Sequence, residues 1–500
     1  MPKLRWLGSI LPPINRLPKE VFVLIPRYFN GRGPRNRIPR DEPLIAMTHV
    51  CRSWRNALIS TPSLWTNINF TNSRKAMEFL DRSKGQLLDV FHFPRLDQDE
   101  IKFFLFITLR NIYRLRSLQL DSHSFQLEWV LAQFAEPAPE LKHLMIANDT
   151  NITGREMELQ NTIFEGQFPK LTSLELHFVR TNLRDFKFPS LTRFYFRTGT
   201  FIPLRDLKLF FERCPLIESV DIGLLYSAQP PPAPPEKRVR LRALRDLELD
   251  QTACTTGLLD NLILTQRTDL LLRGRFTGEK IDHEGEFAAH IHPSSIGHLS
   301  VTREITKAVA MRNWCILSGP NGNLRFCCFE GTREDFNAEY FTSFSPISVL
   351  DIRELWVGQR GDRTWGVWEQ TSDGVLGAFT VLTKVEDLII VRCKTETFFT
   401  TLGSTTDGGI LLPKLRRLKV YVGSGDLDVR ALVQCAKARK GYLHPLEEVV
   451  IVLEREMGVN FVQEMESLRE FVGELSCRIG EAPKLSYDME GIPGYNVRLG

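Results

Sequence analysis

A histidine-rich segment is the first place in this chain where residue types and spacing could do chemistry. His290 and His292 are two residues apart, and Asp282 and His283 precede them. A zinc site on a helix needs two imidazoles four residues apart, and structural zinc sites add cysteine ligands. Neither feature is present, so the sequence predicts no metal ion and no metal-dependent reaction.

Two further segments contain reactive or glycine-rich residues but do not complete a catalytic site. Neighbouring side chains of a strand point to opposite faces, so we expect Cys327 in the core and Cys328 on the open face. A catalytic thiol needs a basic partner, which the sequence does not place near either cysteine. The sequence SGPNGN at residues 318–323 lacks the Lys-Ser/Thr of a phosphate-binding loop. We therefore predict a protein that is not an enzyme and needs no cofactor.

The composition is that of a globular protein with balanced charge. The chain has 500 residues, of which 43% are hydrophobic and 25% charged, so disorder throughout is excluded. Lys and Arg number 64 against 60 Asp and Glu, and the net charge of +4 gives no reason to expect nucleic acid as a partner. The length allows about three domains or one long array of repeats.

Cysteine usage and hydropathy predict a reducing compartment and no membrane partner. The nine cysteines are thinly spread and include no C-x-x-C pair, unlike a disulfide framework. The most apolar run, residues 101–109, is about half a membrane span and contains Lys102. We expect an intracellular protein of the cytoplasm, the nucleus or both.

A chain that binds rather than catalyses needs elements that position its binding residues, and the sequence predicts two kinds of such element. The first is a helical block at residues 17–66. Apolar residues recur there at helical spacing, and Pro18 suits a first helical turn. Pro26 removes the hydrogen bond to the carbonyl of Phe22, so the first helix should kink or end. Gly, Pro and Arg predict a loop at residues 30–43. The recurring residues are Val21, Leu24, Ile25, Tyr28 and Phe29, then Val50, Trp54 and Leu58.

The second kind of element is a short strand with the pattern L-x-x-L-x-L, where L is any apolar residue. Twelve such frames begin about 28 residues apart on average, within the range of leucine-rich repeats. One gap is twice as long, and its midpoint holds the strand-like run Leu270 to Leu272. The frames are Leu115-Leu118-Leu120, Leu141-Leu144-Ile146, Leu171-Leu174-Leu176, Leu191-Phe194-Phe196, Ile217-Val220-Ile222, Leu244-Leu247-Leu249, Ile296-Leu299-Val301, Leu324-Cys327-Phe329, Ile352-Leu355-Val357, Val385-Leu388-Ile390, Leu415-Leu418-Val420 and Leu446-Val449-Ile451.

Stacked frames of this kind predict an α/β solenoid, a horseshoe of parallel strands. One repeat cannot bury its apolar side alone, so only the array is stable. A proline-rich stretch at residues 229–236 should be an exposed loop between repeats. The position where such repeats usually place Asn holds His123, Asp149 or Val179 instead, so we expect an irregular solenoid.

Side chains between the second and third apolar positions of a frame should face the concave surface and bind the substrate. Acidic and aromatic side chains together are typical of interface hot spots, and they predict a bound protein segment with basic and apolar residues. The candidates are Glu175, Tyr195, Asp221, Glu248 and Trp356, with Trp365 and Trp368 in the loop after Trp356.

The helical block resembles the F-box family. The motif L-P-x-E-V begins at Leu17, V-C-R-S-W-R at Val50 and S-L-W at Ser63, in the order of the family. The resemblance implies a three-helix F-box over residues 17–66 that docks on a Skp-type adaptor, and a unit this small also carries more apolar side chains than it can bury. By this resemblance the adaptor-binding residues are Leu17, Pro18, Val21, Ile25, Val50, Cys51 and Trp54, while Leu64 and Trp65 close the F-box against the rest of the chain.

The resemblance also implies a function, because many F-box proteins carry leucine-rich repeats behind the F-box. The family's adaptor connects to a cullin scaffold and a RING subunit, and the F-box protein selects the substrate by raising its effective concentration near the ubiquitin carrier. The chain then divides into a leader (1–16), the F-box (17–66), the repeats (67–480) and a tail (481–500). An interaction scaffold without ubiquitination output and a small-molecule receptor are the alternatives.

Overall fold

The chain folds into two compact α/β units. Unit 1 comprises Met1–Thr200 and Arg213–Leu216, and unit 2 comprises Phe201–Glu212 and Ile217–Gly500. Together they contain a long, mostly parallel sheet of 17 strands, so the predicted α/β class with parallel strands is confirmed. The computed structural model describes residues 17–29, 41–92, 98–122, 124–148, 157–160, 162–184, 186–198, 202–223, 238–250, 255–264, 267–273, 296–311, 314–327, 351–358, 372–406, 409–422, 427–454 and 459–480. The predicted leader, the proline-rich loop 229–236 and the tail 481–500 lie outside these residues.

Unit 1 begins with the helices of the predicted helical block. The first helical stretch is interrupted at Val23, because Pro26 has no N–H to donate to the carbonyl of Phe22. The predicted kink is confirmed: the helix breaks at Val23 and resumes at Leu24, with Pro26 buried inside α3 (Leu24–Phe29). The helices are α2 Lys19–Phe22, α3 Leu24–Phe29, α4 Glu42–Thr48 and α5 Arg52–Ile59, followed by the 3-10 turn η2 Pro62–Leu64.

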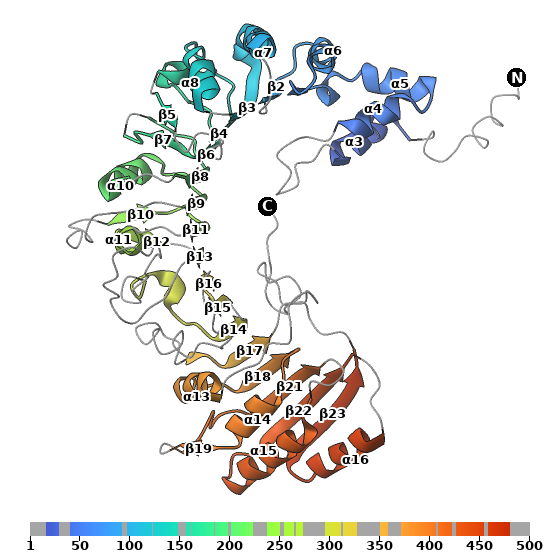
Figure 1. Cartoon of the computed structure of the whole chain (residues 1–500), viewed down its shortest axis with the longest axis vertical. Coiled ribbons are helices and arrows are strands. Elements are labelled where there is room, and N and C mark those ends of the chain that lie inside the picture. Colours follow the sequence, from blue (N-terminus) through green and yellow to red (C-terminus); the bar gives the residue numbers. More distant parts are fainter. Residues whose placement is uncertain are drawn as a thin grey trace, which may run out of the picture. The chain divides into compact units, whose positions relative to one another are not determined.

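After these helices, unit 1 continues as parallel strands whose helical connections lie on one side of the sheet (Figure 1). The strand pairings run β1-β2-β3-β4-β6-β8, and all of them are parallel. The sheet strands are β1 Asn67–Asn69, β2 Leu88–His92, β3 Leu115–Ser122, β4 His143–Asn148, β6 Ser173–His177 and β8 Arg193–Arg197. The connections contain α6 Ser73–Ser83, α7 Gln98–Arg110, η3 Ile112–Arg114, α8 Ser124–Ala132 and η4 Ile163–Gly166, with a small parallel sheet of β5 Met157–Leu159 and β7 Val179–Thr181.

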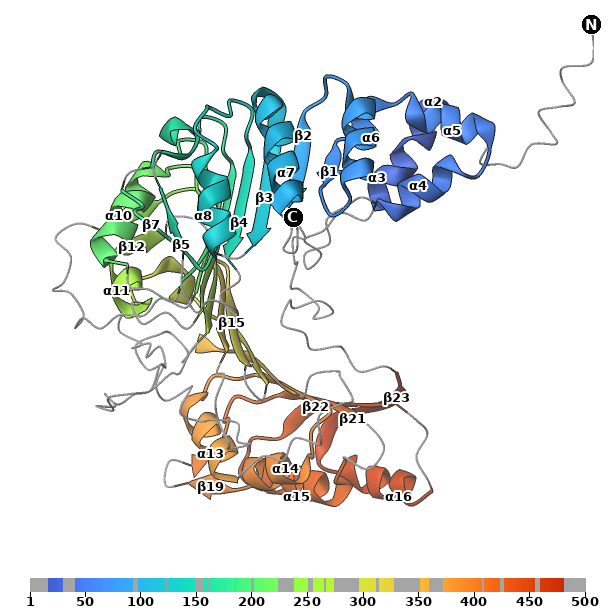
Figure 2. The ribbon, with the colours of Figure 1, turned by 45° about the horizontal axis from the view of Figure 1, so that its top comes forward.

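Unit 2 follows the same plan, and an antiparallel hairpin interrupts it once. The pairings run β9-β11-β13-β16-β15-β14-β17-β18-β21-β22-β23, and only β16–β15 and β15–β14 are antiparallel. Figure 2 shows α13 to α16 along one face of the last strands. The strands are β9 Ser219–Gly223, β11 Asp246–Asp250, β13 Asp269–Arg273, β14 Lys307–Met311, β15 Trp314–Gly319, β16 Gly322–Cys327, β17 Glu354–Gly358, β18 Asp387–Val391, β21 Arg417–Val422, β22 Leu446–Leu453 and β23 Val472–Ile479.

The remaining elements of unit 2 are its helices and two small sheets. The helices are α10 Leu204–Arg213, α11 Thr255–Asp260, η6 Ser300–Thr302, α13 Ser372–Val381, α14 Glu396–Leu402, α15 Val429–Gly441 and α16 Val459–Leu468. The small sheets pair β10 Val239–Leu241 with β12 Leu262–Leu264, and β19 Thr405–Thr406 with β20 Gly409–Ile410.

Strand register confirms the predicted stacking in most frames. The second position Leu144 pairs with Leu118 on one side and with Leu174 on the other, and all three are buried. A backbone ladder marks the same period, because the N–H after the first apolar position donates to the equivalent carbonyl of the preceding frame. Examples are Lys142 to Arg116 and Glu447 to Arg416, both at 2.8 Å. The strand predicted at Leu270 to Leu272 is also confirmed as β13.

Two of the predicted frames are wrong. Ile296-Leu299-Val301 lies in a turn and in η6, not in a strand. Leu324 pairs with Leu270, which makes Leu324 a second position rather than a first, and Phe326 takes the third. The hairpin β14-β15-β16 explains these errors, because it inserts extra strands into the parallel order. The apolar residues of such strands alternate every two positions, which matches part of the L-x-x-L-x-L pattern.

A row of phenylalanines runs through the core of unit 1 beneath the helices. Phe104, Phe134 and Phe164 are spaced by 30 residues, and their ring centroids lie 6.4 Å and 5.5 Å apart in turn. Phe164 continues the row to Phe168 at 5.9 Å. Each connection thus contributes an aromatic ring that fills the space between neighbouring repeats.

Candidate binding surfaces

The helical block of unit 1 has four large apolar side chains that are exposed, and we call this set the apolar surface. Its four members are large side chains at which 39% to 59% of the residue is exposed to solvent. Single exposed leucines are ordinary, but four large apolar residues within one small helical block are not. They are Leu17, Val21, Leu24 and Val50.

These residues are exposed because their neighbours fill the inner side of the block. Phe22, directly after Val21, is 5% exposed, and its ring packs edge-on against Trp54 at 4.7 Å between centroids. Pro26 and Leu44 are buried as well. The interior is therefore already occupied, and Val21 cannot be buried by the block itself.

Contacts with α6, the helix that follows the first strand, hold the block in place. Trp65, after η2, is fully buried and stacks edge-on with Phe79 of α6 at 4.8 Å. The Arg82 guanidinium lies 4.3 Å from the Trp65 ring centroid, and Lys75 pairs with Asp41 at 2.6 Å. The apolar surface is thus presented by a block that is fixed to the sheet of unit 1.

Of the predicted adaptor-binding residues, four are exposed and three are half-buried. Leu17, Pro18, Val21 and Val50 are exposed, and Ile25, Cys51 and Trp54 are half-buried. Cys51 is the N-cap residue of α5. Leu24 belongs to the surface but not to the predicted set, although its place on the apolar helical face was a signal that could have found it.

The face of the unit 1 sheet without helices carries a polar and aromatic cluster on β6 and β8, which we call the Tyr195 cluster. Glu175 pairs in register with Tyr195, and His177 with Arg197. The His177 and Tyr195 rings lie 4.4 Å apart, and the Arg197 guanidinium lies 5.1 Å from the Tyr195 centroid. Glu175 Oε2 is 3.9 Å from His177 Nε2. Two predicted substrate residues, Glu175 and Tyr195, are therefore brought together here.

In unit 2 one of the two predicted acidic positions is paired with an arginine. Asp221 and Glu248 are half-buried and pair in register on β9 and β11. Glu248 forms an ion pair with Arg273 at 2.7 Å. A charge that is already engaged is less available to a basic ligand, so this part of the face attracts such a ligand less than the sequence pattern indicates.

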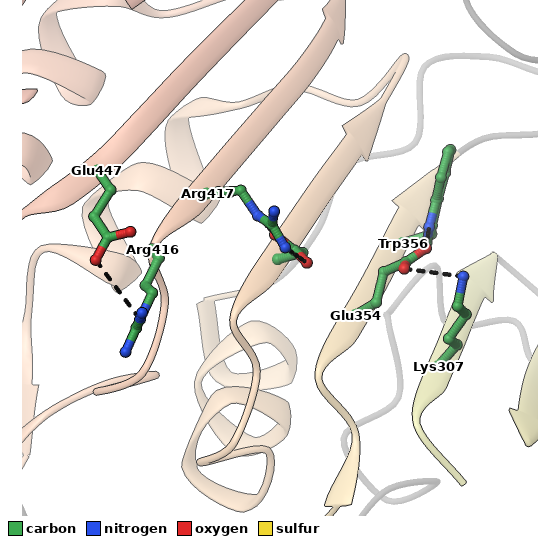
Figure 3. Close-up of polar contacts among 7 residues, drawn as sticks. Lys307, Glu354, Trp356, Arg416, Arg417 and Glu447 are labelled. Carbon is green, nitrogen blue, oxygen red and sulfur yellow. Dashed lines mark hydrogen bonds and ion pairs between the residues drawn. The ribbon is translucent and has the colours of Figure 1, made fainter. Parts of the chain in front are cut away.

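The last predicted substrate residue, Trp356, lies on the same face of unit 2 but is only 5% exposed. Its indole N–H donates to Glu354 at 2.7 Å, and Glu354 also pairs with Lys307 at 3.1 Å (Figure 3). The buried cluster around Trp356 contains Val309, Ile316, Ile389, Val391, Tyr421 and Val452. Trp356 thus has a packing role in this structure, and Trp365 and Trp368 lie outside the described residues.

Ion pairs between neighbouring strands continue along unit 2 near the strand starts, as Figure 3 shows for Arg416 and Glu447. Pairs with this exposure contribute little to stability individually, but they fix which charges remain for a partner. The pairs are Lys307–Glu354 at 3.1 Å, Asp387–Arg417 at 2.6 Å and Arg416–Glu447 at 3.7 Å.

Among the described residues, no group of three His, Cys, Asp or Glu side chains could hold a metal ion. None of the helices in this part of the chain is long and apolar enough to cross a membrane. The segment from Asp282 to His292 and Cys328 lie outside the described residues. An open depression of about 670 Å³ at the end of α7, between Tyr113 and Pro137, contains none of the predicted site residues.

Comparisons with protein-family models and with curated proteins give no match. What the chain does must therefore be argued from the two surfaces themselves, the apolar surface of the helical block and the helix-free face of the strands.

Proposed function

We propose that this protein is the substrate receptor of a Skp-cullin-F-box ubiquitin ligase. In this proposal residues 17–66 are an F-box that docks on a Skp-type adaptor, and residues 67–480 are a leucine-rich repeat solenoid that binds the target protein. The single observation that carries the proposal is the apolar surface formed by Leu17, Val21, Leu24 and Val50.

The apolar surface supports a protein partner on energetic grounds. Burying a fully exposed side chain of this size contributes about 1.5–3 kcal/mol, and these four are 39% to 59% exposed, so each can add about half of that on docking. Together the four are enough to anchor an interface. The motif residues Leu17, Val21 and Val50 lie among the four exposed ones, which is the arrangement that adaptor contacts require. Trp54 supports them from behind through its contact with Phe22.

In this proposal the repeats need no catalytic residues. A receptor acts by holding its substrate near the charged ubiquitin carrier that the cullin and RING subunits recruit, which raises the effective concentration of the acceptor lysine. The helix-free face of the strands offers side chains held in register, as in the pair Glu175 and Tyr195. Such an assembly belongs to the cytoplasm or the nucleus.

The test is adaptor capture with the full chain. We compare the wild type with Val21→Glu/Val50→Glu, which places two charges on exposed positions and leaves the contact between Phe22 and Trp54 intact. Leu443→Glu is the matched control, because Leu443 is 87% exposed and lies in unit 2. Trp54→Ala is less suitable, since it also removes a packing contact. We expect the double variant to lose about tenfold or more of its affinity for a purified Skp-type adaptor.

Two outcomes would count against the proposal. Equal adaptor recovery by the wild type and the double variant would show that the apolar surface is not the docking site. When the adaptor is supplied together with cullin and RING subunits, recovery of the adaptor alone would favour an interaction scaffold without ubiquitination output.

A further inference from the structure

The Tyr195 cluster lies on a strand in which buried residues alternate strictly with residues of the helix-free face. In β8, Phe194 and Phe196 are buried on the helix side, so Arg193, Tyr195 and Arg197 alternate with them onto the helix-free face. Burial of the two phenylalanines fixes the strand, and a fixed strand presents its outward side chains at set distances.

Contacts from β6 hold the centre of the cluster. His177, which is nearly buried, stacks on the Tyr195 ring at 4.4 Å, and the Arg197 guanidinium lies 5.1 Å from the same ring. A guanidinium that is oriented by an aromatic ring loses less freedom on binding than a mobile one, and its planar fork matches a carboxylate. The cluster is therefore organised before any ligand arrives.

Along β8 the cluster carries two arginines and no carboxylate. Arg193 is exposed and makes no ion pair with the described residues, and Arg197 adds a second guanidinium four positions later. The nearby carboxylate of Glu175 faces His177 at 3.9 Å. In an extended strand four residues span about 14 Å, so the Cα atoms of Arg193 and Arg197 are separated by about that distance, with Tyr195 between them.

We propose that the Tyr195 cluster docks an acidic segment of the substrate protein, with carboxylates on Arg193 and Arg197 and an apolar side chain near the Tyr195 ring. This inference rests on the proposed receptor function and names the class of its substrate. It reverses the charge expected from the sequence, which singled out Glu175 of this cluster and, in unit 2, Asp221 and Glu248. Glu175 lies 3.9 Å from His177, and Glu248 forms an ion pair with Arg273.

The experiment measures binding of labelled peptides to the full chain by fluorescence anisotropy. Three decapeptide pools share one phenylalanine in a Gly/Ser/Ala background and carry Glu, Gln or Lys at two positions four residues apart. The protein variants are Arg193→Glu, which changes an exposed side chain, and Arg197→Gln. Arg180→Glu is the control, because Arg180 is an exposed arginine of unit 1 on β7, in the small sheet.

The Glu pool should bind at least about tenfold more tightly than the Gln and Lys pools, and its affinity should fall as salt is added. Arg193→Glu and Arg197→Gln should each abolish this preference, and Arg180→Glu should retain it. Equal binding of the Glu and Gln pools, or an unchanged preference in Arg193→Glu, would overturn the inference.

Adaptor capture is measured on the same proteins, so the two proposals can fail separately. Lost adaptor binding with an intact peptide preference contradicts the receptor function alone. Retained adaptor binding without a peptide preference contradicts the acidic-segment inference alone.

Discussion

The indole N–H of Trp65 donates a hydrogen bond to the carbonyl oxygen of Leu58 at 2.9 Å, and both residues are fully buried. Leu58 belongs to α5, and Trp65 lies two residues before β1, so the bond fixes the end of the helical block just before the first strand. The S-L-W element makes this contact, and the resemblance to the F-box family implies that this element closes the block against the rest of the chain.

Loss of the Trp65 contacts should unfold the junction. Trp65→Ala removes a buried ring that also packs on Phe79, and we expect a loss of about 3–5 kcal/mol in the free energy of unfolding. Trp65→Phe keeps an aromatic ring but leaves the Leu58 carbonyl without its donor, at a cost of about 1–3 kcal/mol. Urea unfolding measures both, with the exposed Trp129→Ala as the control. A Trp65→Ala protein as stable as the control would contradict this account.

Arg439 of α15 should stabilise the last repeats although it is fully buried. Its guanidinium donates to the backbone carbonyls of Leu411 and Leu412 at 2.9 Å and 3.0 Å, and burial lowers its pKa. Arg439→Met leaves these acceptors unpaired, so we expect a loss of about 3 kcal/mol or more in urea unfolding. Arg430→Met, at an exposed position of the same helix, should change stability by less than about 0.5 kcal/mol. Similar losses in the two variants would show that the carbonyl contacts contribute little.

The parallel strands could be predicted because their core positions are aliphatic or aromatic at fixed spacing. Frames such as Leu171-Leu174-Leu176 satisfy both the strand alternation and the repeat period. Strand β2 escaped prediction because its third inward position is His92, and β1 because only Ile68 is apolar among its three residues. The 30-residue spacing of Phe104, Phe134 and Phe164 was present in the sequence and could have strengthened the period.

Exposure at the two surfaces could not be read from residue types. Val21 and Phe22 are neighbouring apolar residues, yet one is exposed and the other is buried against Trp54. Trp356 has the side chain of a hot spot but is packed into a cluster with Val309. Which side of an element is covered depends on tertiary packing, and one sequence without its fold does not determine it.

His92 should make the protein less stable in mild acid. It is buried against Phe104 at 4.6 Å, its ring nitrogens have no hydrogen-bond partner among the described residues, and burial lowers its pKa to about 4. The unfolded chain binds a proton there below about pH 6.5, whereas the folded chain does so only near its own pKa. Stability should therefore fall by about 3 kcal/mol between those two pH values.

The measurement for His92 is urea unfolding at neutral pH and at pH 5. His92→Leu removes the titrating group and should lose less stability on acidification than the wild type. His444→Leu is the control, since His444 is exposed in unit 2 and its replacement should leave the pH dependence unchanged. Parallel pH profiles for the wild type and His92→Leu would contradict the assignment.

Gly322 should be indispensable for the hairpin that interrupts the parallel order of unit 2. It has φ +125°, a conformation that L side chains rarely adopt, and a Cβ atom there would lie 2.0 Å from the carbonyl oxygen of Thr268. Gly322→Ala must therefore shift backbone, and we expect it to cost more than about 3 kcal/mol in thermal or urea unfolding. Gly85→Ala is the matched control, because a Cβ at Gly85 meets no atom within 4 Å. A Gly322→Ala protein that unfolds at the same urea concentration as Gly85→Ala would show that the β15–β16 turn is not built as described.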